Sequence, residues 1–177
     1  MPGNKMIKPI WLIAMSLAVL SLLVAPAAVA QQSTNKMPET STPRPEMINR
    51  GDAISAYNTF KADPINNLNV APTFLKFIET DGEAHVVLHP TLTAWMYEDH
   101  EAEARAVLYA AYMGGNMNAQ LVGESTGDDP VEAMRGVLIA YEKLKIKHEL
   151  LSIPLLESLQ AHVVNDTLAG EIEKITN

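Results

Sequence analysis

The chain has 177 residues, of which 47% are hydrophobic, and it contains no cysteine. It carries 13 basic and 21 acidic residues, which gives a formal net charge of −8. This acidic balance repels phosphate backbones and anionic lipid surfaces and so argues against nucleic-acid binding. The lack of cysteine excludes disulfides and cysteine nucleophiles.

The first 30 residues have the three parts of a secretory signal peptide. Lys5 and Lys8 form a basic start, an apolar or small run covers residues 10–24, and Ala28-Val29-Ala30 provides a small-residue cleavage site. The apolar run has 15 residues, whereas a membrane-spanning helix needs about 20. We therefore expect cleavage after residue 30, no stable membrane span in the mature protein, and a periplasmic or secreted location.

Residues 31–52 are predicted to be a disordered tether. They are rich in Gln, Ser, Thr, Asn and Pro and almost free of apolar residues, so they bury too little surface to fold. Loss of residues 1–30 removes two lysines and no acid, which leaves 11 basic and 21 acidic residues and a net charge of −10. Residues 53–177 then suit one domain.

The domain is predicted to begin with a short turn of helix after residue 53, because apolar residues recur there at helical spacing. Asp63-Pro64 indicates a loop after this turn. Residues 73–89 fit two alternatives equally, the face of a helix or a short β-hairpin that turns at Asp81-Gly82.

The clearest predicted helix runs from Trp95 to Leu121, with an apolar stripe opposite a charged face. Gly114-Gly115 lies within it. We expect this pair to break the helix, with a second short helix after it. The alternative is a continuous helix in which another backbone approaches the glycines closely.

Gly127–Pro130 predicts the start of the next helix, because aspartate caps free amides and proline suits the first helical position. That helix runs to about Lys147. Ser152–Pro154 starts another, whose apolar face changes sides at Asn165-Asp166. This change predicts a break, with the aspartate capping a short final helix.

Together these patterns predict a mainly α fold, a compact single-domain bundle of about five helices. One short β-hairpin near residues 73–89 remains open as the alternative to helix there.

The candidate metal ligands are His100, Glu103 and His89. Asp99, His100 and Glu103 fall on the apolar side of the predicted helix, where a charge is costly unless it is paired or bound to a metal. His100 and Glu103 are three residues apart and could share one cation. The simpler interpretation is a first helical turn, where acids complement free amides and the helix dipole.

Tyr109, Tyr112, Met113 and Tyr141 are the candidate ligand-binding residues. Tyrosine and methionine can line an apolar groove that adapts to its ligand. Such side chains at helical spacing more often form plain core.

Gly123-Glu124-Ser125-Thr126-Gly127 has the Gly-x-Ser-x-Gly spacing, but it lies between two predicted helices, whereas a nucleophile elbow follows a strand. No phosphate loop or EF-hand pattern occurs, and we expect no cofactor. We predict an exported, non-enzymatic helical protein that binds another envelope protein or a small apolar ligand. One alternative is a small metal-assisted hydrolase that uses Asp99, His100 and Glu103, with His85 or His89 brought from elsewhere. The other is a self-associating structural protein of the envelope.

Overall fold

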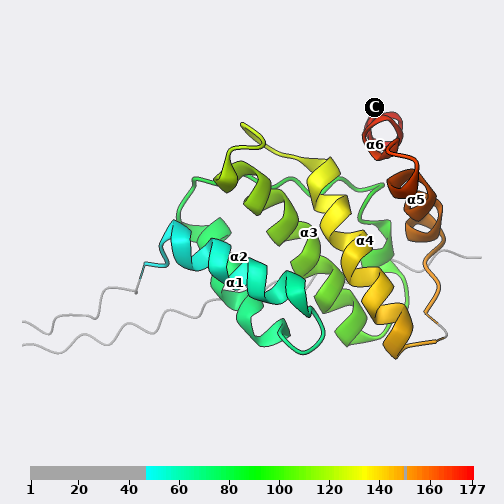
Figure 1. Cartoon of the computed structure of the whole chain (residues 1–177), viewed down its shortest axis with the longest axis horizontal. Helices are drawn as coiled ribbons and strands as arrows, with labels where there is room; N and C mark the ends of the chain where they lie inside the picture. The colour runs from blue at the N-terminus through cyan, green and yellow to red at the C-terminus, as the bar shows by residue number, and fades with distance from the viewer. Residues whose placement is uncertain (1–46, 150) are drawn as a thin grey trace, which may run out of the picture. The chain divides into compact units, whose positions relative to one another are not determined.

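The structure, a computed structural model, describes residues 47–149 and 151–177, which form helices and loops without any strand (Figure 1). The predicted signal peptide and residues 31–46 of the predicted tether lie outside these residues. None of the helices described has the length and apolar content that crossing a membrane requires. The helices are α1 (Arg50–Ala62), α2 (Ala71–Thr80), α3 (Ala102–Val122), α4 (Pro130–Lys147), α5 (Pro154–Val164) and α6 (Leu168–Thr176), with short 3-10 turns at Leu68–Val70 and Ala94–Tyr97.

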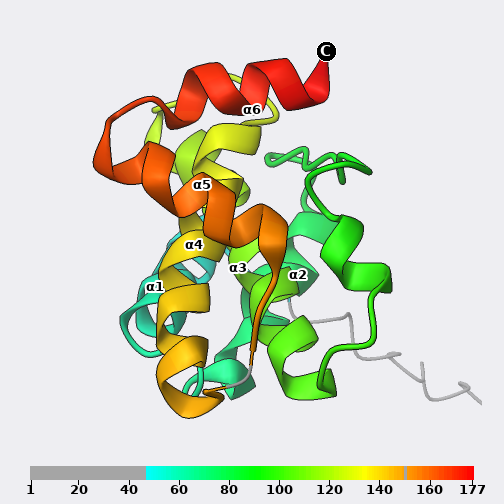
Figure 2. The ribbon, with the colours of Figure 1, turned by 90° about the vertical axis from the view of Figure 1, so that its right-hand side faces the viewer.

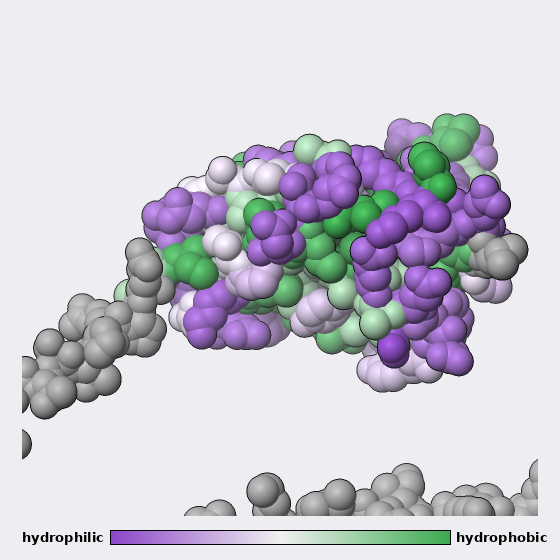
Figure 3. Space-filling model, turned by 90° about the horizontal axis from the view of Figure 1, so that it is seen from below, coloured by the Kyte–Doolittle hydropathy of each residue, from purple (hydrophilic) through white to green (hydrophobic). Residues whose placement is uncertain are grey.

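The two longest helices, α3 and α4, form the central antiparallel pair (Figures 1 and 2). α1 and α2 pack on each other and on α3, while α5 and α6 follow along the other side of α4. Buried apolar side chains from all six helices form one core. On the face shown in Figure 3, polar residues dominate and apolar ones appear as separate patches. The predicted mainly α bundle is confirmed, with six helices in place of about five.

α1 is longer than the short turn that the sequence predicts. The side chain of Asn49 accepts a hydrogen bond from the Asp52 N–H and caps the helix, so α1 starts at Arg50, within the last residues assigned to the tether. At its other end, Lys143 of α4 donates hydrogen bonds to the last carbonyl groups of α1. A local cap and a distant lysine together extend the helix in both directions.

Residues 73–80 are helical, so the hairpin alternative is wrong. α2 buries Phe74 and Phe77 on one face, and the ring of Phe74 meets that of Tyr57 edge-on, with 5.7 Å between centroids. Residues three apart share a face of a helix but lie on opposite faces of a strand. After α2, Gly82 has a φ of 78° and turns the chain into a loop.

The chain between α2 and α3 has no strand partner and is held by side chains instead. Gln120 of α3 accepts from the His85 N–H at 3.0 Å and donates to the His85 carbonyl at 2.9 Å. The Val87 N–H donates to Asp128 Oδ1 at 2.7 Å, and the Val87 carbonyl accepts from the Tyr112 hydroxyl at 2.9 Å. Burial raises the pKa of Tyr112 to about 12, so its hydroxyl keeps the proton that this bond needs.

α3 runs without interruption from Ala102 to Val122, so the predicted break at Gly114-Gly115 is wrong. A Cβ atom at Gly115 would lie 2.6 Å from the carbonyl oxygen of Glu132 in α4, and one at Gly114 would overlap the ring of Tyr57. The glycines therefore admit a second helix backbone and an aromatic ring. The predicted start at Trp95 was also too early, because that residue lies in a 3-10 turn.

The predicted starts of α4 and α5 are confirmed. The Asp129 side chain accepts a hydrogen bond at 2.9 Å from the Glu132 N–H in the first turn of α4, and Pro130 occupies the first helical position. α5 begins at Pro154. The predicted break after α5 is present, but Asp166 does not cap α6. It adopts a φ of 55° where α5 ends, and Thr167 is the N-cap of α6.

Candidate functional site

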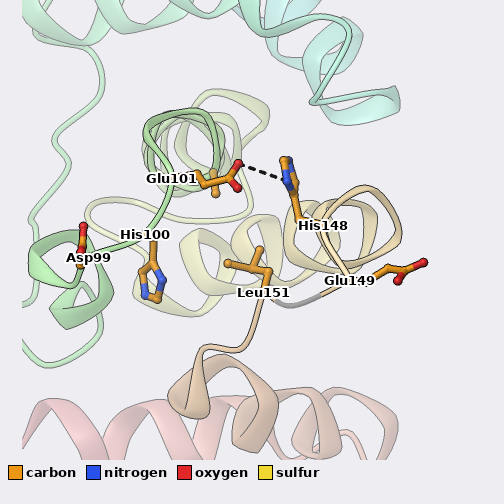
Figure 4. A pocket seen from close by; sticks show the side chains of 7 residues that line it. Asp99, His100, Glu101, His148, Glu149 and Leu151 are labelled. Atoms are coloured by element: carbon orange, nitrogen blue, oxygen red, sulfur yellow. Dashed lines mark ion pairs between the residues drawn. The ribbon is translucent and has the colours of Figure 1, made fainter.

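A pocket of about 340 Å³ opens where the start of α3 lies beside the end of α4 (Figure 4). The residues that line it are Asp99, His100, Glu101, Ala104, His148, Glu149 and Leu151. Three of these are carboxylates and two are histidines, so the pocket is acidic and rich in hydrogen-bonding groups. Its volume is at the lower end of the range of small-ligand pockets, roughly 300–1,000 Å³.

The direction of the two helices explains why these side chains meet. α3 and α4 are antiparallel, so the N-terminus of one lies beside the C-terminus of the other. The helix dipole favours acidic side chains at a helix N-terminus and basic side chains at a helix C-terminus. Glu101 and Glu103 stand at the start of α3, and Lys147 and His148 stand at the end of α4. The acids at the start of α3 and the bases at the end of α4 therefore lie opposite each other.

His148 is held between two carboxylates. Its Nδ1 lies 3.2 Å from Glu101 Oε2, and its Nε2 lies 3.2 Å from Glu103 Oε2. Lys147 Nζ lies 2.6 and 2.8 Å from the two carboxylate oxygens of Glu103. The hydrogen bond from Lys147, with a smaller effect of His148, lowers the pKa of Glu103. The imidazole ring is thus fixed in the pocket wall, with Glu101 reaching toward it in Figure 4.

His100 lies on another wall of the pocket. Its Nε2 is 3.0 Å from Glu98 Oε2, and its side chain is only 13% exposed. Asp99 and Glu149 are the outermost of the residues labelled in Figure 4, and the Glu149 side chain points away from the others. Neither forms an ion pair with any residue among 47–149 and 151–177. Two exposed carboxylates at the edge of the pocket are therefore not neutralised by any basic side chain of the described residues.

Two of the predicted metal ligands, His100 and Glu103, stand at this end of α3 but have different partners. His100 lines the pocket and bonds to Glu98, whereas Glu103 is outside the lining and bonds to Lys147 and His148. They do not share a site. In the part of the chain that the structure describes, no three His, Cys, Asp or Glu side chains are grouped so that they could hold a metal ion.

The third predicted metal ligand, His89, lies far from this end of α3. Its Nε2 is 2.9 Å from Asp128 Oδ2, and Asp128 Oδ1 accepts a hydrogen bond from Asn116 at 2.8 Å. Asn116 follows Glu103 by 13 residues, which is about 20 Å along a helix that rises 1.5 Å per residue. His89 belongs to the network that holds the loop before α3.

None of the four predicted ligand-binding residues lines this pocket. Tyr112 and Tyr141 are fully buried, and the Tyr141 hydroxyl accepts a hydrogen bond from the Ile153 N–H at 2.9 Å. Tyr109 and Met113 are partly buried and pack against the core. In the structure all four contribute to packing, and the two buried hydroxyls also fix loops.

Sequence reasoning missed Glu101, His148 and Glu149 as members of one site. Part of the signal was local, because the acids before α3 and the bases that close α4 both follow the helix-dipole rule. Their meeting depends on the antiparallel packing of α3 and α4, which no local pattern specifies.

No protein-family model matches the chain, and neither a curated protein nor a solved structure is significantly similar to it.

Glu103→Gln is expected to lower the stability of the protein at neutral pH but not in acid. The pKa of Glu103 is lowered from its ordinary value of 4.5. Its ion pairs therefore stabilise the fold above that value and lose this effect as the pH falls through the lower folded-state pKa. Urea unfolding of both proteins across a series of acidic buffers should show their free energies of unfolding converge. A constant difference at every pH would contradict this role, and Glu173→Gln, an exposed acid on α6, serves as the control.

Proposed function

We propose that this protein is an exported, non-enzymatic binding protein whose pocket between α3 and α4 recognises a positively charged group. The observation that carries the proposal is the pair of free carboxylates, Asp99 and Glu149, in a pocket whose wall holds a third, Glu101. Carboxylates form short, charge-assisted hydrogen bonds with ammonium and guanidinium groups. The occupant that complements this lining is a cation with N–H donors.

The composition of the lining narrows the chemistry that it could perform. None of the seven lining residues carries a hydroxyl, thiol or amine, so a covalent mechanism would have to use a carboxylate or an imidazole. The histidines are engaged with glutamates, His100 with Glu98 and His148 with Glu101. They therefore present fixed polar surfaces to a ligand.

The location outside the cytoplasm is part of the same proposal. It is supported by the basic start, the 15-residue apolar run and the Ala-Val-Ala site in residues 1–30. Binding of another envelope protein, the partner expected from the sequence, is compatible with an acidic pocket. The small apolar ligand is less so, because the lining has only two apolar residues, Ala104 and Leu151. The metal-assisted hydrolase has no grouping of ligands among the described residues in its favour.

Titration with N-acetyl-arginine amide tests the proposal, with N-acetyl-glutamine amide as the uncharged probe. We expect the guanidinium probe to shift the NMR signals of the His100 and His148 rings in a saturable way. Glu101→Gln and Asp99→Asn should each weaken the binding several-fold, and Glu173→Gln on α6 should leave it unchanged. Equal responses to both probes, or none to either, would refute the proposal.

A further inference from the structure

We infer that the positively charged group is a lysine or arginine side chain of a protein partner, bound together with apolar residues beside it, and that it is not a free small amine. This inference rests on the proposed function and names the class of partner. Three features of the pocket and its surroundings carry it.

The first feature is the exposure of the carboxylates. The side chain of Glu101 is 69% exposed, and an ion pair between exposed groups raises affinity by no more than about fivefold. A lone cation in this pocket therefore binds weakly, and useful affinity must come from contacts outside it.

The second feature is the shortage of apolar walls. Sites for free small molecules surround most of the ligand with apolar and aromatic side chains, whereas here only Ala104 and Leu151 are apolar. The pocket suits the end of a long side chain. Lysine and arginine pack their carbon stems on a surface and place the charge at the tip, and the rest of the partner remains outside.

The third feature is an exposed aromatic residue that is close in sequence to the pocket lining. Tyr97 is 84% exposed and stands two residues before Asp99. It belongs to the 3-10 turn that leads into the pocket, and Trp95 anchors this turn because it is buried and its indole N–H donates to the Leu92 carbonyl at 2.9 Å. Tyrosines presented on a rigid surface are frequent energetic centres of protein interfaces.

Charge complementarity selects a basic partner over a neutral or acidic one. The run from Glu98 to Glu101 places three acids beside Tyr97, and the chain as a whole has a net charge of −8. Such a surface attracts a basic partner at long range and discriminates against acidic proteins. The partner surface that fits is a basic side chain flanked by apolar residues.

The test compares an acetylated and amidated peptide, Ala-Leu-Arg-Leu-Ala, with N-acetyl-arginine amide at the same ionic strength. We expect the peptide to bind about tenfold more tightly, since an aromatic hot-spot contact contributes more than 1 kcal/mol. Replacing the peptide's arginine by glutamine should weaken binding by up to about fivefold. Tyr97→Ala should remove the tenfold advantage of the peptide without changing the affinity for the arginine amide.

The control variant is Val164→Ala, which changes an exposed apolar residue on α5 that does not line the pocket. It should bind both probes as the unmodified protein does, and circular dichroism should show that all the variants are folded. If the peptide and the amide bind equally and Tyr97→Ala has no effect, the inference is overturned while the proposed function stands. If neither probe binds, the proposed function fails as well.

Discussion

Gly115→Ala is expected to lower the free energy of unfolding by about 3 kcal/mol, because the added methyl group forces α3 and α4 apart. Its Cβ would lie 2.6 Å from the carbonyl oxygen of Glu132, a backbone atom that cannot rotate away. Alanine by itself favours a helix interior over glycine by about 1 kcal/mol. A net loss in urea unfolding therefore reports the steric conflict between the helices and not a change in helix propensity.

Gly170→Ala is the matched control, since it makes the same change in α6 where an added Cβ meets nothing within 4 Å. It should raise stability by about 0.5 kcal/mol. If Gly115→Ala behaved in the same way, the close approach of α3 and α4 would be disproved.

Gly114→Ala separates a side-chain conflict from a backbone one. Here the added Cβ would overlap the ring of Tyr57, and a ring can be removed by mutation. In a Tyr57→Ala background, Gly114→Ala should therefore cost at least 1 kcal/mol less than in the unmodified protein, a coupling typical of residues in contact. The nearest conflict of Gly115→Ala is with the backbone of α4, so the Tyr57→Ala background should reduce its destabilisation by less.

Asn116→Leu is expected to cost about 3 kcal/mol, because it removes three hydrogen bonds and leaves the Asp129 N–H without its acceptor. Asn116 is fully buried. Its Nδ2 donates to Asp128 Oδ1 at 2.8 Å, while its Oδ1 accepts from Gln120 Nε2 at 2.6 Å and from the Asp129 N–H at 3.1 Å. Leucine has a similar size but satisfies none of these groups.

The same variant should loosen the loop before α3. Gln120 and Asp128, which Asn116 positions, accept hydrogen bonds from the N–H groups of His85 and Val87. Hydrogen exchange at those two amides should therefore accelerate in Asn116→Leu more than exchange in α5. Unchanged protection at His85 and Val87 would show that the network does not hold the loop.

Asn118→Leu provides the matched control, two residues further along α3. Its Oδ1 is buried and accepts no hydrogen bond from the described residues. Removing a desolvated polar atom that lacks a partner should be neutral or slightly stabilising. The contrast between two asparagines of one helix isolates the hydrogen bonds from the general effect of the substitution.

The helix boundaries that the sequence predicted correctly are those set by local chemistry. Asp129-Pro130 starts α4 and Pro154 starts α5, because a capping carboxylate and a proline act on the amides of the adjacent turn. The predicted break at Asn165-Asp166 is also present, since a change of apolar face within a few residues cannot continue in one helix.

The errors arose where distant residues decide the outcome. Gly114-Gly115 reads as a helix end in isolation, and only Tyr57 and the α4 backbone show why a continuous helix needs glycine there. Residues 73–89 looked equally suited to a hairpin. Their second half is fixed by α3 side chains more than 20 residues away, such as Tyr112 and Gln120.

The candidate site shows the same division. The sequence alone determined a mainly helical chain, an acidic character, and helix ends marked by acids before α3 and bases at the end of α4, since capping and dipole effects act within one turn. Only the tertiary structure decided that Glu103 meets Lys147 and His148, which follow it by 44 and 45 residues. It also decided that His89 bonds to Asp128 and does not join His100 and Glu103. Which helix ends become neighbours depends on how apolar faces pack, and that choice is made by the core as a whole.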